Sequence, residues 1–373
     1  MTVSIVKVQS RKQLRDFISF PEKLYADNPY WVPALRGDEF DTFDRKNNGA
    51  YEYCDSELYL AYKDGEIVGR VAALINFNAN RDWNQSTVRF GWLDFIEDIE
   101  VLQALMDAVA QWGREKGCRE MKGPLGFTDM DKEGLLVEGF DKLCPFTCIY
   151  NYPYYVTMLE QLGFTKDVDW TQKIVDIEPQ LPEMFKFCDI VEKRSGLHMA
   201  HAKTTGELAD KYGLDIFHLY NEAFVPLFQF TPLTDKQIKR YLQTYRAIMS
   251  PDFIAICLNE KEEPVGFGFC VPSLAKAVKK SGGRMFPLGW LRILKALKKN
   301  DVLEALMIGT LPEYQGKGAT LLVMRELHQN CVKLGIEKMI MNPQLEENSK
   351  VQTLFDGFNY DIYMRRRSYR KDI

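Results

Sequence analysis

The chain has 373 residues, of which 46% are hydrophobic and 27% charged, with a net charge of -4. This length is too great for one ordinary core and favours two domains of a globular protein. The slightly acidic balance argues against a protein that binds nucleic acid by bulk electrostatics, so we expect no nucleic-acid partner. The eight cysteines are scattered, and no apolar run is long enough to cross a bilayer, which favours a cytoplasmic protein with reduced thiols.

The first half of the chain predicts an alternation of strands and helices. A charged turn leads into a strand within Lys63–Asn76, and Phe90–Ile96 is a short apolar strand. Apolar residues at helical spacing then predict a helix over Glu100–Lys116. Cys118–Lys122 follows as a strand, and a short helix over Met158–Phe164 precedes a terminal strand.

The second half repeats these landmarks in the same order. Its segments are Asn259–Pro272, Leu303–Gly309, Gly318–Leu334, Ile336–Met341 and Thr353–Phe358, again with a terminal strand. We therefore predict an α/β fold class with two tandem copies of one unit, each a mixed, mostly antiparallel sheet flanked by helices. Prolines within Asp176–Pro182 interrupt the pattern, so the domains are predicted as residues 1–177 and 178–373. The alternative is that ordinary α/β units are alike by chance.

The most specific segment is Thr310–Thr320. It lies between an apolar strand and a helix, and glycines at 316 and 318 uncover successive backbone N–H groups where the helix begins. The helix dipole adds partial positive charge and Lys317 adds a full one, so the loop suits a pyrophosphate. It is neither the dinucleotide fingerprint, which needs a third glycine, nor a nucleotide P-loop, which ends in Gly-Lys-Ser/Thr. A glycine turn that only starts a helix is the alternative.

This segment resembles the acyl-CoA loop of the GNAT (Gcn5-related N-acetyltransferase) superfamily. The family pattern is Gln/Arg-x-x-Gly-x-Gly/Ala, and Gln315, Gly318 and Thr320 stand at its positions, with Thr320 in place of the usual Gly or Ala. The order of elements in the second half also follows the family. The whole chain resembles the tandem-domain subgroup, although only the second half has the diagnostic loop.

The resemblance implies an acyl-CoA-dependent N-acyltransferase, with acetyl-CoA or another acyl-CoA as co-substrate and no metal. The primary amine of a small molecule or peptide would attack the thioester directly. The residues implied for coenzyme binding are Leu311, Gln315, Gly316, Lys317, Gly318, Ala319, Thr320 and Asn348. The resemblance also implies that a free backbone N–H at Thr310 or Leu311 polarises the thioester carbonyl.

Proton transfer has a candidate base but no evident acid. Glu304 is a carboxylate inside an otherwise apolar strand, and we predict it as the base that deprotonates the amine. A strand-end residue that faces solvent is the alternative. The family often places a tyrosine acid where this chain has Phe355, so Tyr360, Tyr363 or solvent would have to protonate the thiolate.

The first copy lacks the glycine loop. Glu97, Asp98 and Glu100 stand at the corresponding helix start, where carboxylates satisfy the helix dipole and repel a pyrophosphate. We therefore expect this copy to bind no coenzyme A and to serve as structure or as one wall of an acceptor pocket.

Residues 273–300 form a basic insertion that has many interleaved apolar residues and no acidic one. Such a segment fits contact with a membrane surface or lipidic acceptor, or helices packed on the domain with a solvated charged face. Two rival functions stay open. One is a non-catalytic acyl-CoA sensor, which Phe355 favours, and the other is a tandem relative that uses aminoacyl-tRNA, for which this insertion is the only basic candidate.

Overall fold

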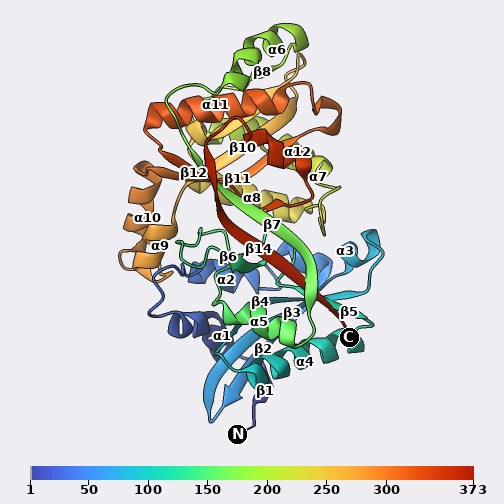
Figure 1. Ribbon diagram of the computed structural model, residues 1–373. Helices are drawn as coiled ribbons and strands as arrows, with labels where there is room; N and C mark the ends of the chain where they lie inside the picture. Colours follow the sequence, from blue (N-terminus) through green and yellow to red (C-terminus); the bar gives the residue numbers. More distant parts are fainter. Residues whose placement is uncertain (1) are drawn as a thin grey trace. The chain divides into compact units, whose positions relative to one another are not determined.

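The computed structural model describes residues 2–373, apart from the side chain of Ala247, and separates into two compact units (Figure 1). Unit 1 comprises Met1–Thr171, Leu274–Ile293 and Met364–Ile373, and unit 2 comprises Gln172–Ser273 and Leu294–Tyr363. Each unit is a mixed sheet with helices on its faces, which confirms the predicted fold class. The division into domains 1–177 and 178–373 stays a prediction.

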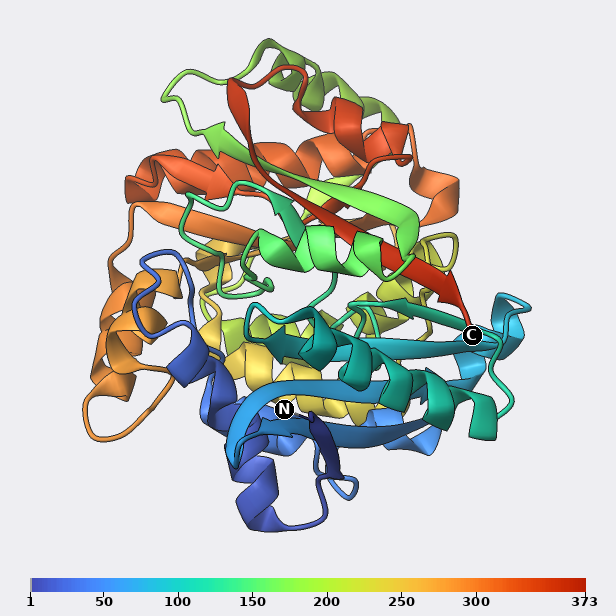
Figure 2. The ribbon, with the colours of Figure 1, turned by 60° about the horizontal axis from the view of Figure 1, so that its bottom comes forward.

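Unit 1 contains the elements predicted for the first half, preceded by two helices. Its elements are β1 (Ser4–Lys7), α1 (Arg11–Leu24), α2 (Arg36–Thr42), β2 (Cys54–Lys63), β3 (Glu66–Asn76), α3 (Phe77–Asp82), β4 (Thr87–Phe95), α4 (Ile99–Glu115), β5 (Glu120–Gly123), β6 (Leu135–Glu138), α5 (Tyr154–Gln161) and the start of β7 (Thr165–Asp176). Strands β1, β2, β3 and β4 pair antiparallel in that order, and β4 pairs parallel with β5. Helix α4 crosses one face of this sheet (Figure 2). Its side chains Val101, Leu105 and Val109 are fully buried.

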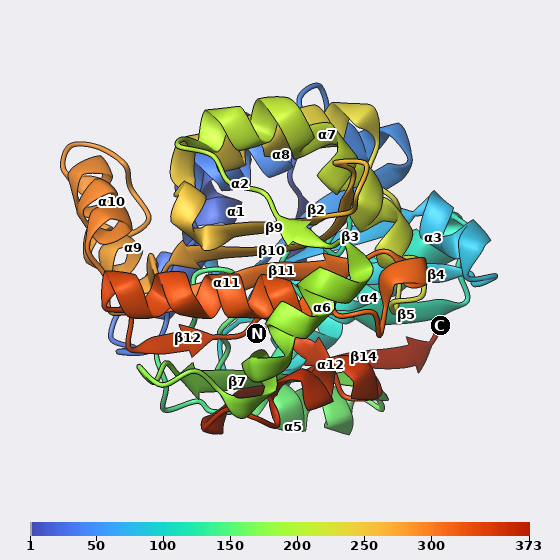
Figure 3. The same ribbon diagram turned by 90° about the horizontal axis from the view of Figure 1, so that it is seen from above.

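Unit 2 repeats this plan. Its elements are the end of β7, α6 (Cys188–Ser195), β8 (His198–Met199), α7 (Thr205–Ala223), α8 (Asp235–Ile248), β9 (Ile254–Leu258), β10 (Pro264–Pro272), β11 (Val302–Thr310), α11 (Ala319–Leu334), β12 (Lys338–Ile340), β13 (Gln344–Leu345), α12 (Ser349–Gln352) and the start of β14 (Tyr360–Asp372). The strands follow the order β7-β12-β11-β10-β9-β8. Helix α11 covers one face of the sheet, and α7 and α8 cover the other (Figure 3). The basic insertion forms two helices, α9 (Ala275–Ser281) and α10 (Gly289–Lys298).

The two halves of the chain exchange their last strands. In unit 2, the end of β7 pairs antiparallel with β12, with Ile174 opposite Ile340. In unit 1, the end of β14 pairs antiparallel with β5, with Tyr369 opposite Gly123. Each sheet is therefore completed by a strand that the other half of the sequence supplies, and the sequence pattern did not predict this exchange.

Helices α4 and α11 end in the same way. This explains why the strand after each of them starts later than predicted. Gly117 has φ +83° and Gly335 has φ +71°, a left-handed conformation that glycine adopts without strain. The following N–H groups reach back into the helices, from Cys118 to the carbonyl of Gly113 at 2.8 Å and from Ile336 to that of Cys331 at 3.0 Å. Since those residues close the helices, β5 and β12 begin only after them.

Candidate functional site

The strand that leads to the predicted loop carries a bulge. Strand β11 pairs antiparallel with β10, with Phe269 opposite Met307 and Cys270 opposite Ala305, so Leu306 is the extra residue. Beyond the bulge, the N–H of Leu311 donates to the carbonyl of Val265 at 3.0 Å. In an antiparallel pair, alternate residues direct their N–H groups to opposite sides. The amides of Ile308 and Thr310 therefore point away from β10.

The amides of Ile308 and Thr310 face the side on which β11 separates from β12, its parallel neighbour. The parallel register of β11 with β12 runs from Val302 opposite Lys338 to Glu304 opposite Ile340. Strand β11 then continues through Thr310, whereas β12 ends at Ile340. Of the two amides implied by resemblance, that of Thr310 is directed to this side, whereas that of Leu311 is bonded to β10. The amide of Ile308 is a further donor that the sequence did not indicate, because the bulge leaves no signature in the residue types.

The loop folds as a tight turn that leads into the N-terminus of α11, where the residues that the structure describes provide no side-chain cap. A 3-10 turn over Pro312–Tyr314 is followed by Gly316 at φ +74° and Gly318 at φ +98°. Gly318 is the N-cap of α11, and in the part of the chain that the structure describes it receives no side-chain cap. The first amides of α11 are therefore left without the capping oxygen that usually covers them, and they sit at the positive end of the helix dipole.

The two glycines are required for different reasons. At Gly316, an added Cβ would find nothing within 4 Å, so only the backbone conformation demands glycine there. At Gly318, an added Cβ would lie 2.5 Å from Cγ1 of Val191, which α6 presents to the turn. Gly318 thus allows α6 to pack closely against the start of α11, a contact that the sequence did not reveal.

Polar side chains fasten the loop on both sides. The hydroxyls of Thr310 and Thr320 lie 2.9 Å apart, and Nε2 of Gln315 donates to the carbonyl of Thr310 at 3.5 Å. Nζ of Lys350 donates to Oε1 of Gln315 at 3.2 Å. The ammonium of Lys317 lies over the ring of Tyr314 at 5.3 Å, on an exposed part of the loop. Leu311, Gly316, Lys317 and Ala319 complete the predicted set on the same turn.

The predicted base lies on the same strand and is buried. Glu304 is 2% exposed, and its Oε1 accepts a hydrogen bond of 2.6 Å from the hydroxyl of Ser273. The sequence left a solvent-facing carboxylate as the alternative, and the burial excludes that alternative. Ser273 was not identified from the sequence, because it follows the end of β10 and only the pairing of β10 with β11 brings it near Glu304.

Asn348, which was predicted to bind the coenzyme, and Phe355, at the position of the family tyrosine, have structural roles in this conformation. Asn348 caps α12 by accepting a hydrogen bond of 3.3 Å from the N–H of Val351. Phe355 is 4% exposed and packs in the apolar core of unit 2 with Phe358. Nζ of Lys173 lies 5.5 Å from the centre of the Phe355 ring and 4.4 Å from that of the Tyr360 ring. Burial lowers the pKa of Lys173, while Asp356 acts in the opposite direction.

The corresponding turn of unit 1 is already filled by protein groups. Asp98 is the N-cap of α4, where Oδ1 accepts from the N–H of Glu100 at 2.9 Å. Its Oδ2 accepts from Nζ of Lys63 at 2.7 Å, and this bond holds the pKa of Asp98 below its usual range. Strand β4 also differs from β11 in its backbone contacts: the N–H of Leu125 donates to the carbonyl of Phe90 at 2.9 Å, and the N–H of Phe95 donates to the hydroxyl of Tyr155 at 3.0 Å. The absence of coenzyme binding in the first copy stays a prediction, and these contacts are consistent with it.

In the chain from residue 2 onward, no group of three or more His, Cys, Asp and Glu side chains is arranged to hold a metal ion. Burial raises the pKa of Cys144 to about 11, with the cation of Arg366 acting in the opposite direction. His198 bonds through Nε2 to Glu262 at 2.9 Å.

Comparison with known proteins finds two relatives in sequence. No profile of a known protein family matches the chain. The chain is 27% identical over 373 residues to protein YghO of Escherichia coli strain K12, covering 98% of this chain and 94% of YghO. It is 23% identical over 382 residues to the bacterial ceramide synthase of Caulobacter vibrioides, covering 99% of this chain and 97% of that protein.

A solved structure establishes the architecture. A tandem GNAT protein from the clavulanic acid biosynthesis pathway superposes with a TM-score of 0.58 at 10% sequence identity, covering 99% of this chain and 98% of its own. At this identity the likeness shows the fold alone. The chain therefore has the tandem GNAT fold.

Proposed function

We propose that this chain is an N-acyltransferase that moves an acyl group from acyl-CoA to the primary amine of a long-chain lipid. The binding of acyl-CoA, the acyl donor, is inferred from the turn at Gly316 and Gly318. It presents uncapped amides at the start of α11 beside the place where β11 and β12 part. A diphosphate there gains hydrogen bonds, the helix dipole and the charge of Lys317.

The chemistry follows from groups on one strand. The amine nitrogen attacks the thioester carbonyl carbon, and the carbon–sulfur bond breaks. The amides of Ile308 and Thr310 are placed to hold the oxygen that gains negative charge. Glu304 takes the proton of the amine directly or through water, with its carboxylate fixed by Ser273. The departing thiolate receives its proton from solvent, Tyr360 or Tyr363, since Phe355, at the position of the family tyrosine, has no proton to give.

The acceptor class is supported by a relative of nearly equal length. The bacterial ceramide synthase aligns over almost all of both chains. Ceramide is an amide between a fatty acyl group and a long-chain amino alcohol, so its synthesis is an N-acylation. This relative favours a long-chain amine over the small-molecule or peptide amine expected from the sequence, and a long acyl chain over acetyl.

A donor titration tests the loop. Calorimetric titration of coenzyme A into the wild type should give a dissociation constant that rises about tenfold or more in Lys317→Glu, because the substitution reverses a charge next to the diphosphate. Lys333→Glu makes the same charge change in the last turn of α11, far from the predicted diphosphate site. It should leave the dissociation constant of coenzyme A within about twofold of the wild-type value. Equal effects of the two substitutions would mean that the diphosphate binds elsewhere.

A turnover assay tests the reaction and its acceptor. Acyl-CoAs from acetyl to palmitoyl are incubated with a long-chain amino alcohol, a hexosamine or a polyamine, and amide products are detected by mass spectrometry. The proposal predicts amide formation with the long-chain amine and a long acyl-CoA. Coenzyme A binding without any amide product would favour the non-catalytic sensor, for which the buried Phe355 is the supporting observation.

A further inference from the structure

The helical pair α9–α10 presents an apolar and basic surface that no other part of the structure covers. Six large apolar side chains between Met285 and Leu294 are exposed, led by Phe286 at 79% and Leu288 at 53%. The whole run from Arg284 to Leu288 is exposed at the tip between the two helices. Leaving so many adjacent apolar groups in water is unfavourable and marks a contact surface.

We propose that this tip docks the protein on the surface of an anionic phospholipid bilayer. We name the tip the 284–295 patch, after its exposed apolar and basic residues. The proposal concerns where the protein works and does not depend on the acyl transfer proposed above.

The patch is anchored to the protein through α9. Nζ of Lys279 donates to the backbone carbonyls of Asn28 and Trp31, each at 2.8 Å. The N–H of Arg36 donates to the carbonyl of Gly283 at 3.1 Å, and Val278 is fully buried. Since the base of the hairpin is fixed within unit 1, the exposed tip is a defined surface of the folded unit.

The apolar and basic side chains on α10 are arranged in two adjacent stripes. Trp290, Leu291 and Leu294 form the apolar stripe at helical spacing, and they are 40%, 46% and 45% exposed. The exposed Lys295 and the half-buried Arg292, whose Nη1 donates to the carbonyl of Lys280 at 2.7 Å, lie on the neighbouring side of the same helix. A helix with this pattern lies in the plane of a bilayer interface, with apolar groups among the acyl chains and cations at the headgroups.

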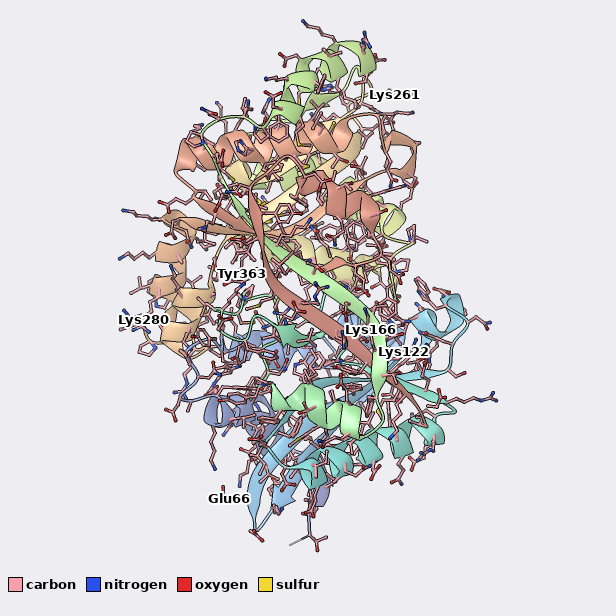
Figure 4. The ribbon with its side chains drawn as sticks, viewed as in Figure 1. Glu66, Lys122, Lys166, Lys261, Lys280 and Tyr363 are labelled. Atoms are coloured by element: carbon pink, nitrogen blue, oxygen red, sulfur yellow. The ribbon has the colours of Figure 1, made fainter. Side chains whose placement is uncertain are left out.

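The charge of residues 273–300 indicates an anionic partner. Residues 273–300 contain eight Lys and Arg and no Asp or Glu, whereas the whole chain has a net charge of -4. The rest of the chain therefore carries -12, from -4 minus 8. Lys280, which Figure 4 labels on this segment, is one of the exposed cations. Positive charge concentrated on one apolar surface of an acidic protein complements anionic lipid headgroups.

The mode of attachment is peripheral. Along residues 2–373, the structure contains no helix with both the length and the apolarity that a bilayer crossing requires. The contact is therefore limited to the depth that Phe286, Trp290 and their neighbours reach. Such binding is reversible and sensitive to salt.

Sedimentation of the full chain with vesicles tests the proposal. Vesicles of phosphatidylcholine mixed with phosphatidylglycerol should pellet the wild type, and vesicles of pure phosphatidylcholine should pellet much less of it. The double variant F286S/L291S should lower the bound fraction at least about tenfold, because it removes two apolar groups from the patch. F187S removes another exposed aromatic residue, 61% exposed and outside the patch, and should bind as the wild type does.

Two results would overturn the inference. One is a wild type that stays in the supernatant with anionic vesicles at low salt. The other is a double variant that binds like the wild type while its melting temperature is unchanged. If the patch instead joins two copies, size-exclusion chromatography without lipid will show a dimer that F286S/L291S dissociates. Because these assays contain no acyl-CoA, they can fail while the acyltransferase proposal stands, and the reverse also holds.

Discussion

The hydroxyl of Thr310 lies 2.9 Å from the hydroxyl of Thr320. This contact links the last residue of β11 to the first turn of α11, so it joins the two ends of the loop. Thr310 is 7% exposed, so the hydrogen bond is shielded from competing water. It fixes the amides of the turn relative to the strand that carries Glu304.

A double-mutant cycle should detect this link. Thr310→Val and Thr320→Val each remove one hydroxyl while keeping the branched shape. We expect a coupling free energy of about 1 kcal/mol between them in urea unfolding, which is the usual size of a neutral hydrogen bond. Additive effects would show that the two hydroxyls act independently, for example through water.

The two glycines of the turn should differ in their sensitivity to alanine. Gly316→Ala should lower the free energy of unfolding by about 1 kcal/mol, since only its positive φ is strained. Gly318→Ala should cost about 3 kcal/mol, because its Cβ also meets Val191. Adding Val191→Ala should restore part of the stability lost in Gly318→Ala and none of that lost in Gly316→Ala. Equal costs for the two glycines would contradict the described packing of α6.

Glu304→Gln tests the assignment of the base. Glutamine keeps the size and an oxygen that accepts the Ser273 hydroxyl but takes up no proton. We expect kcat with the best amine to fall at least about 100-fold while the affinity for coenzyme A is retained. Glu337→Gln makes the same change at an exposed site in unit 2 and should leave kcat unchanged. Retained turnover in Glu304→Gln would assign the proton transfer to another group.

Unit 1 should become less stable as the pH rises from 5 to 8. Burial raises the pKa of Glu133 to about 8, with Asp129 adding to the rise and Arg89 opposing it. The folded state therefore holds a proton that the unfolded state releases near its ordinary pKa, so the stabilisation present at low pH is lost through this window. The loss from this group should be about 2 to 4 kcal/mol.

Unfolding measured at pH 5 and pH 8 checks this sign. Glu133→Gln should remove most of the difference, since glutamine has no proton to release. Glu115→Gln, on the exposed side of α4, should behave like the wild type. Asp131, whose pKa is raised to about 6 by burial, contributes a smaller fall in the same direction in all three proteins. A wild type that gains stability toward pH 8 would contradict the account.

Much of the fold was predictable because it depends on local patterns. The helices α4 and α11, their closing glycines and the loop before α11 follow from periodicity and from residues that favour positive φ. The exchange of β7 and β14 was not predictable, since the pairing of distant strands depends on register and tertiary packing. For the same reason the bulge at Leu306, the partner Ser273 of Glu304 and the approach of Val191 to Gly318 became visible only in the structure.

The crystal structure of the chain with coenzyme A tests the central claim most directly. The account predicts diphosphate oxygens at about 3 Å from the amides of Gly316, Gly318 and Ala319, with the thiol end directed toward the gap between β11 and β12. A diphosphate bound away from this turn, or no bound coenzyme at saturating concentration, would contradict it.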